Sequence, residues 1–134
     1  PHTWNTFQPF INWLNDPLLE VWERLNYTIG NTNCKPEQSW LNLHKNTGQT
    51  LEHAHGYVEL VVTCYLKLPK NGGYIEYRDP LDQLKVNTPT YENASFYEVP
   101  AITGDVLIFP GWLKHRTQPN LSNEDRIVMT INCM

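Results

Sequence analysis

The sequence has no long hydrophobic run, few cysteines and no excess of basic residues, and each shortage excludes a class of protein. No apolar run approaches the roughly 20 residues that a membrane span requires. The three cysteines, Cys34, Cys64 and Cys133, show no paired spacing, which argues against a disulfide-stapled secreted domain. Ten basic residues face fourteen acidic ones, which argues against nucleic-acid binding. No signal-peptide pattern is visible, so we expect a cytoplasmic protein with no membrane or nucleic-acid partner.

The length and composition indicate one folded domain. The chain has 134 residues, of which 40% are hydrophobic, enough to build one core without a metal or a disulfide. We expect a single domain over residues 1–134, with an N-terminal helical segment at 1–30 and a β-rich core at 39–133.

The N-terminal segment has the apolar spacing of a helix. Apolar residues recur at steps of four or three from Phe10 to Leu25, which places them on one helical face. Asp16 and Pro17 are suited to cap and begin a second helix, which would end near Gly30. We therefore expect one or two helices packed on the core.

From residue 39 onward, short apolar runs alternate with turn residues. About eight strands at this spacing predict a mainly β fold, and a double-sheet jelly roll fits best. The expected strands are Ser39–Leu43, Leu51–His55, Glu59–Leu68, Tyr74–Tyr77, Ser95–Val99, Asp105–Phe109, His115–Gln118 and Arg126–Cys133.

Two histidines in one expected strand are candidate metal ligands. His53 and His55 are two positions apart, so on a strand both imidazoles would project from one face. Neutral imidazoles held close together suit a divalent transition metal. An H-x-H pair is more often a pair of solvated side chains, so this pattern alone does not decide the matter.

His115 and Arg126 add to the pattern. His115 follows an apolar strand, 105–109, that ends in a Pro-Gly turn, and it lies 60 residues beyond His55. That separation allows the chain to travel round a sandwich and return beside the first pair. Arg126 leads a nearly apolar last strand, where it lies either at the rim or turned inward to meet an anion, because a buried arginine is rare unless paired.

In order and spacing, these pieces resemble the iron(II)- and 2-oxoglutarate-dependent oxygenases, and above all the small members of that superfamily in bacteria and their phages. The resemblance covers roughly residues 39 to 133. The pieces that carry it are Trp40-Leu41-Asn42, His53-Ala54-His55, the stretch from Gly104 through Phe109-Pro110 to His115, Pro119-Asn120, and Glu124-Asp125-Arg126 before the last strand.

The resemblance implies a double-stranded β-helix, which is a cupin-like jelly roll, with Fe(II) at its open end. It implies His53, His55 and His115 as the metal ligands and 2-oxoglutarate and O2 as co-substrates. His55 stands where most of the superfamily has a carboxylate. The third ligand is thus either His55 or a carboxylate such as Glu59 or Asp79. A phage-encoded chain would act in the host cytoplasm.

The resemblance also implies an enzyme, most simply a hydroxylase, that couples oxidative decarboxylation of 2-oxoglutarate to oxidation of a substrate. Arg126 would grip the far carboxylate of 2-oxoglutarate, since a guanidinium meets a carboxylate with two charge-assisted hydrogen bonds. Val128 occupies the position where the family often adds a hydroxyl, so a second donor must come from elsewhere. The candidates for that donor are Tyr65, Thr130 and Asn132, and those for the substrate lining are Tyr57, Trp112 and Asn42.

Two other functions fit parts of the sequence. A metal-binding cupin, of dioxygenase or isomerase type, would use His53, His55, Glu59 and His115 and leaves Arg126 unexplained. A jelly-roll binding module without catalysis would use exposed aromatics such as Trp4, Trp13 and Tyr91. The substrate, small molecule or peptidyl, and the oligomeric state stay open.

Overall fold

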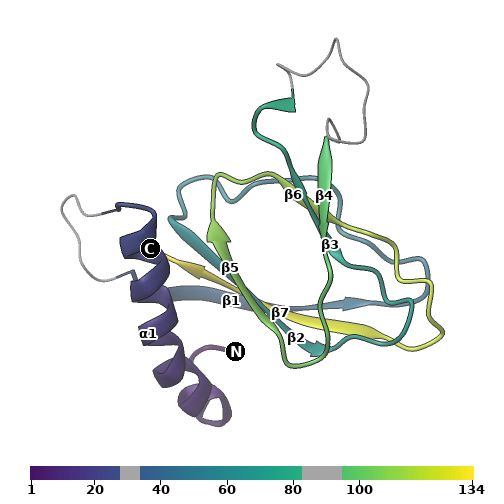
Figure 1. The fold of residues 1–134 in the computed structure, drawn as a ribbon. Coiled ribbons are helices and arrows are strands. Elements are labelled where there is room, and N and C mark those ends of the chain that lie inside the picture. The colour runs from purple at the N-terminus through teal and green to yellow at the C-terminus, as the bar shows by residue number, and fades with distance from the viewer. Residues whose placement is uncertain (28–33, 83–94) are drawn as a thin grey trace.

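The computed structural model describes residues 1–27, 34–82 and 95–134 of the chain. Within these ranges, one α-helix precedes seven strands, and the strands form two antiparallel sheets (Figure 1). A 3-10 turn, η1 (Asn5–Phe7), leads into helix α1 (Gln8–Arg24). The strands are β1 (Pro36–His44), β2 (Leu60–Lys67), β3 (Ile75–Arg78), β4 (Phe96–Val99), β5 (Val106–Pro110), β6 (His115–Thr117) and β7 (Arg126–Cys133).

The larger sheet has the strand order β1-β7-β2-β5, and the smaller sheet the order β4-β3-β6. β7 therefore lies between β1 and β2, although it is the last strand in the chain. Its first residue, Arg126, pairs with His44 at the end of β1. In Figure 1, α1 lies beside the larger sheet and away from the smaller one. The prediction of a mainly β fold with an N-terminal helix is confirmed.

β2 is buried on both faces, which explains its nearly continuous run of apolar residues. Leu60, Val62 and Cys64 belong to one core cluster with Leu14 and Leu18 of α1. The alternate residues Val61, Thr63 and Tyr65 point to the opposite face, since side chains alternate along a strand, and they too are buried. The helix thus covers one face of the larger sheet and leaves the other to form the interior between the sheets.

The second helix expected at Asp16 and Pro17 does not form, because α1 continues through Pro17. A proline inside a helix removes one backbone hydrogen bond. Leu14 and Leu18 lie on either side of it and are both buried against the sheet, and this packing stabilises the uninterrupted helix. The expected helix end near Gly30, and Tyr91, lie outside the described residues.

The expected strand over 51–55 also does not form. His53 alone joins His115 in an isolated antiparallel bridge, in which each backbone N–H donates to the other residue's carbonyl at 3.0 Å. Two residues later the chain turns away, and the His55 N–H donates to the Gly111 carbonyl at 2.8 Å. The segment changes partner within three residues, so no continuous ladder forms. The other seven expected strands correspond to β1–β7.

In the part of the chain that is described, no helix combines the length and the apolar character needed to cross a membrane.

Candidate functional site

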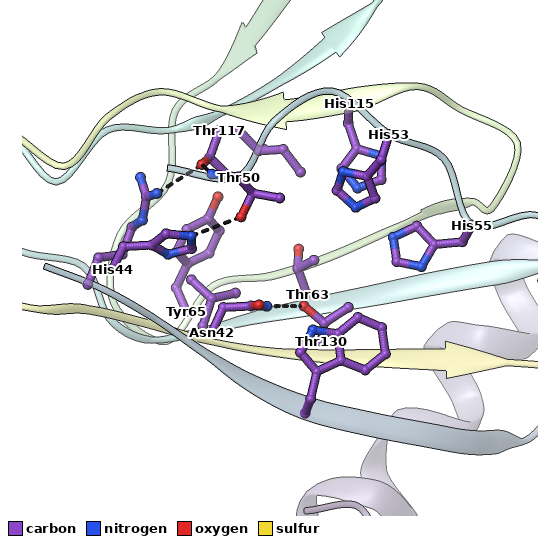
Figure 2. A pocket seen from close by; sticks show the side chains of 14 residues that line it. Asn42, His44, Thr50, His53, His55, Thr63, Tyr65, His115, Thr117 and Thr130 are labelled. Atoms are coloured by element: carbon purple, nitrogen blue, oxygen red, sulfur yellow. Dashed lines mark hydrogen bonds between the residues drawn. The ribbon is translucent and has the colours of Figure 1, made fainter. Parts of the chain in front are cut away.

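A cavity of about 120 Å³ lies between the two sheets. Side chains that alternate along the inner faces of β1, β2 and β7 form much of its wall, and the segment 50–55 and β6 close it. Figure 2 shows three histidines gathered on one side and His44, Tyr65 and Thr117 on the other. The lining residues are Trp40, Asn42, His44, Thr50, His53, His55, Thr63, Tyr65, Ile75, His115, Thr117, Arg126, Val128 and Thr130.

His53, His55 and His115 converge on one point of this cavity. Each offers a ring nitrogen that lies within 4.8 Å of those of the other two. The ring centroids are 4.3 Å apart for His53 and His115 and 5.2 Å apart for His55 and His115. The bridge between His53 and His115 and the hydrogen bond from His55 to Gly111 bring together segments 60 residues apart.

Gly111 is needed for this approach. A Cβ atom at this position would collide with the backbone carbonyl of Val58, so the turn after β5 can lie against the 55–58 segment only because it carries a glycine. Its N–H donates to the Glu59 carbonyl at 3.0 Å. The Pro110-Gly111 turn thus fixes His55 relative to His115.

Hydrogen bonds fix which ring nitrogen of each histidine is free. Nδ1 of His53 lies 2.8 Å from the Leu51 carbonyl, and Nδ1 of His115 lies 2.8 Å from the Leu113 carbonyl. Nδ1 of His55 lies 2.8 Å from Oδ1 of Asn132. Carbonyl oxygens only accept, so each Nδ1 must carry the proton and each Nε2 keeps its lone pair. This is the tautomer that binds a metal through Nε2.

Burial favours the neutral form of His55 and His115. Burial, together with the neighbouring rings of His53 and His55, lowers the pKa of His115 to about 4. The hydrogen bond to the Leu113 carbonyl acts in the opposite direction, because it favours the charged form. Burial and the nearby His53 also lower the pKa of His55, while the bond to Asn132 acts in the opposite direction. Neutral imidazoles are the form that binds a metal, so the lowered pKa values favour the metal-binding form of His55 and His115.

The histidine cluster contains no carboxylate. Glu59 is exposed, and it is not among the residues that line the cavity. Asp79 is buried elsewhere, where Oδ1 accepts from the Leu81 N–H at 2.8 Å and Oδ2 from the Tyr97 hydroxyl at 3.3 Å. Within the described residues, the third member of the cluster is therefore His55, and the arrangement does not support the carboxylate alternatives.

Arg126 lines the same cavity and is only 1% exposed. Its Nη1 donates to the carbonyls of Gly72 at 2.6 Å, Gln118 at 3.0 Å and Gly73 at 3.2 Å. Nη2 donates to Oγ1 of Thr117 at 2.9 Å, whereas Nε is buried without a partner. The side chain is thus held at one end and keeps an unused donor.

Gly73 makes this arrangement possible. Its φ of +76° lies in the left-handed region, and a Cβ atom there would come within 3.0 Å of the Arg126 Nη1 and 2.7 Å of the Pro119 carbonyl. A side chain at position 73 would therefore be strained and would push the guanidinium aside.

The other predicted residues divide into two groups. Tyr65 and Asn42 line the cavity, and Asn42 donates to Oγ1 of Thr130 at 2.9 Å. Asn132, predicted to contact a co-substrate, does not line the cavity. Its Oδ1 accepts a hydrogen bond from Nδ1–H of His55. Tyr57 is fully exposed and Trp112 is 56% exposed, and neither lines the cavity.

The sequence reasoning missed four polar lining residues: His44, Thr50, Thr63 and Thr117. A signal existed for three of them. His44 follows Asn42 by two positions on β1, Thr63 precedes Tyr65 by two on β2, and Thr117 follows His115 by two on β6. Alternation therefore already placed each on the inward face. Thr50 lies outside any strand, and nothing in the sequence marked it.

Buried polar atoms without a partner concentrate at this cavity. Among the described residues there are four: His44 Nδ1, His55 Nε2, Thr63 Oγ1 and Arg126 Nε. All four belong to lining residues. An unsatisfied buried polar group costs about 1–3 kcal/mol, so their convergence indicates a site built to receive a polar ligand.

Comparison with known proteins agrees with this arrangement. A family model described as "Putative 2OG-Fe(II) oxygenase" matches residues 38–132, a range that includes all the lining residues. A comparison with curated proteins finds no match.

Solved structures share the fold at low sequence identity. A prolyl-4-hydroxylase of Pseudomonas putida has a TM-score of 0.65 and 13% identity, and the match covers 99% of this chain and 69% of the hydroxylase. The α-ketoglutarate-dependent carbocyclase SnoK of nogalamycin biosynthesis has a TM-score of 0.58 and 18% identity, with 76% of this chain and 51% of the carbocyclase covered. The epimerase SnoN, solved with Fe3+ and α-ketoglutarate, has a TM-score of 0.53 and 15% identity, with 72% and 48% covered. The chain therefore spans about half the length of the carbocyclase and the epimerase, and the jelly-roll fold is confirmed.

Replacement of Asn132 by alanine is expected to weaken metal binding about 10- to 100-fold, because His55 loses the acceptor that fixes its tautomer. Asn132→Asp keeps an acceptor and should retain the affinity. The measurement is Mn2+ or Ni2+ titration by calorimetry, with Asn42→Ala as a cavity control that touches no histidine. Equal affinities in Asn132→Ala and the parent protein would contradict this role.

Stability of the metal-free protein should fall as the pH is lowered from about 6.5 to about 4. In this window the unfolded chain binds a proton at residue 115, whose ordinary pKa is 6.5, and the folded chain does not. Unfolding therefore takes up protons, and acid favours it. The difference corresponds to about 3 kcal/mol at most. Urea unfolding in a chelator, across this pH range, measures it; His115→Gln should decline less steeply, and an identical decline would contradict the assignment.

Proposed function

Because this chain belongs to the 2OG-Fe(II) oxygenase family, we propose that it is an Fe(II)- and 2-oxoglutarate-dependent oxygenase, most simply a hydroxylase. The observation that carries the proposal is a single cavity with a triad of Nδ1-anchored histidines and a buried arginine that keeps a free donor. A metal-binding end and an anion-binding end in one small cavity match a co-substrate that chelates a metal and ends in a second carboxylate.

In this proposal, His53, His55 and His115 hold Fe(II) through their Nε2 atoms. The three imidazoles would bind the ion as nitrogen ligands, which suit a divalent transition metal. Bound Fe(II) supplies the redox chemistry that converts 2-oxoglutarate and O2 to succinate and CO2 and oxidises a substrate C–H bond. The protein's part is to orient the rings through the Leu51, Leu113 and Asn132 acceptors.

Arg126 binds the far carboxylate. Of the lining residues in the described part of the chain, it alone carries a permanent charge, so the cavity favours an anion at that end. Its Nη1 is already used by three carbonyls, which hold the guanidinium still and leave Nε to meet the ligand. Since the charge is removed from water, its interaction with a carboxylate is stronger than at the surface.

The cupin alternative has less support. It relied on Glu59 as a further ligand, and that side chain is exposed away from the cluster. It also gives no role to the free donor of a buried arginine.

The remaining parts of the proposal concern the protein as a whole. We propose a single catalytic domain that acts in the cytoplasm on a small-molecule or peptidyl substrate, without nucleic acid or membrane. Its support is the sequence, in which acidic residues outnumber basic ones and the cysteines show no paired spacing.

The decisive assay is succinate formation from 2-oxoglutarate with Fe(II), ascorbate and air. The parent protein should release succinate even without a prime substrate, at a low rate. Replacement of His115 by alanine should abolish both metal loading and succinate release, with His2→Ala as the surface control. A parent protein that binds Fe(II) and makes no succinate would favour the cupin alternative, and unchanged metal content in His115→Ala would remove His115 from the ligand set.

Replacement of Arg126 should separate co-substrate binding from metal binding. Arg126→Ala is expected to keep Mn2+ affinity within a few-fold and to lose about 1.5–3 kcal/mol of 2-oxoglutarate binding, the contribution of a hydrogen bond to a charged group. Calorimetry with Mn2+ under anaerobic conditions measures both. Arg126→Lys is the second variant if the alanine variant unfolds, since it keeps the charge and loses Nε. Unchanged affinity for 2-oxoglutarate in both variants would exclude the role.

A further inference from the structure

His44 lies opposite Arg126 in the sheet. The two residues are direct partners in the antiparallel pairing of β1 with β7, and both line the cavity. Directly opposite residues have Cβ atoms about 5 Å apart on the same face. The imidazole and the guanidinium therefore share one end of the cavity.

The position of His44 is fixed at its backbone. Its carbonyl accepts from Nδ2 of Asn120 at 2.8 Å, and the same Nδ2 donates to the Glu124 carbonyl at 2.8 Å. Asn120 is fully buried, so it ties the end of β1 to the turn that precedes Arg126. This contact holds the histidine beside the arginine.

The ring of His44 has one satisfied nitrogen and one unsatisfied nitrogen. Nε2 lies 2.8 Å from Oγ1 of Thr50, as the dashed line in Figure 2 shows. Nδ1 is buried and has no partner. When the Thr50 hydroxyl donates to Nε2, the neutral ring carries its proton on Nδ1. Thr50 is itself held by its N–H, which donates to Oγ1 of Thr117 at 2.8 Å.

The same Thr117 oxygen accepts from Arg126 Nη2 at 2.9 Å. Oγ1 of Thr117 thus accepts hydrogen bonds from both Thr50, which contacts the imidazole, and Arg126. Two side chains on one cavity wall each keep a buried and unused nitrogen, His44 Nδ1 and Arg126 Nε. Val128, which is the next residue of β7 on the same face, offers no hydrogen bond, so β7 supplies no donor directly beside Arg126.

We propose that His44 is the second donor to the far carboxylate of 2-oxoglutarate, through Nδ1–H, and acts together with Nε of Arg126. This inference rests on the proposed function. It places the second hydrogen-bond donor on β1, whereas the family often has it on the last strand, at the position of Val128. A neutral donor suits the site: burial and the Arg126 guanidinium both lower the pKa of His44, so the ring adds a hydrogen bond without placing a second charge beside the arginine.

Two substitutions separate ligand binding from a structural role. In His44→Asn, the amide nitrogen takes the place of Nδ1 and the contact to Thr50 is lost. In His44→Gln, the amide reaches the place of Nε2, keeps the contact to Thr50 and removes the donor at Nδ1. If Nδ1 binds the carboxylate, His44→Gln should weaken 2-oxoglutarate binding about tenfold or more, and His44→Asn should weaken it by no more than two- to threefold.

The experiment is calorimetric titration of the Mn2+-loaded protein with 2-oxoglutarate under anaerobic conditions. His2→Gln is the matched control, because His2 contacts Ser39 outside the cavity. A second titration uses 2-oxopentanoate, which keeps the chelating keto acid and lacks the far carboxylate. Its affinity should be equal, within twofold, in the parent protein and in His44→Gln. Mn2+ affinity should be unchanged in all variants.

The outcomes distinguish the two proposals. If the parent protein does not bind 2-oxoglutarate, the proposed function fails, and with it this inference. If the parent protein binds 2-oxoglutarate and His44→Gln binds it equally well, His44 is not the donor and the proposed function stands. The inference is equally overturned if His44→Asn is the weaker variant, because that result indicates that the contact to Thr50 matters and Nδ1 does not. It is also overturned if His44→Gln loses affinity for both keto acids alike, because the loss then does not depend on the far carboxylate.

Discussion

The antiparallel pairing of β7 between β1 and β2 is the constraint on which the rest of the structure depends. Side chains of β7 reach both the arginine and the histidines of the site: Arg126 lines the cavity, and Asn132 accepts a hydrogen bond from the His55 ring. Because both neighbours of β7 are paired along most of its length, the spacing between these two side chains is fixed by backbone hydrogen bonds. A slip of one residue would turn both to the wrong face.

The cavity combines walls of paired β-strands with buried polar atoms that have no hydrogen-bond partner. Two of the strands that form its wall, β2 and β7, are covered on their other face by α1. Within these walls, His44 Nδ1, His55 Nε2, Thr63 Oγ1 and Arg126 Nε have no protein partner. A metal ion and a carboxylate would satisfy such atoms, and their binding would stabilise the folded state.

Supporting contacts decide the chemistry of the site as much as its direct ligands do. Carbonyl oxygens accept hydrogen bonds from Nδ1 of the three histidines, which leaves each Nε2 with its lone pair. The carbonyls of Gly72, Gly73 and Gln118 accept from Nη1 of Arg126, which leaves Nε without a partner. Two glycines make these contacts possible, Gly111 beside the 55–58 segment and Gly73 beside the guanidinium. Neither glycine has a side chain at the site, and both act by allowing the backbone to approach.

The sequence by itself determined the number and position of most strands, because alternating burial and turn residues are local properties. It also indicated His53, His55, His115 and Arg126 as candidate site residues, because their order and spacing resemble the motifs of the family. It could not establish that Pro17 stays inside one helix, since that depends on packing of Leu14 and Leu18 against the sheet.

Only the tertiary structure decided which residues share the cavity. Glu59 and Asp79 do not belong to the histidine cluster. Asn132 hydrogen-bonds to His55, and His44 lies beside Arg126. The physical reason is that hydrogen-bond partners and burial are set by segments distant in sequence: His55 meets Asn132 across 77 positions, and no local pattern records such a contact.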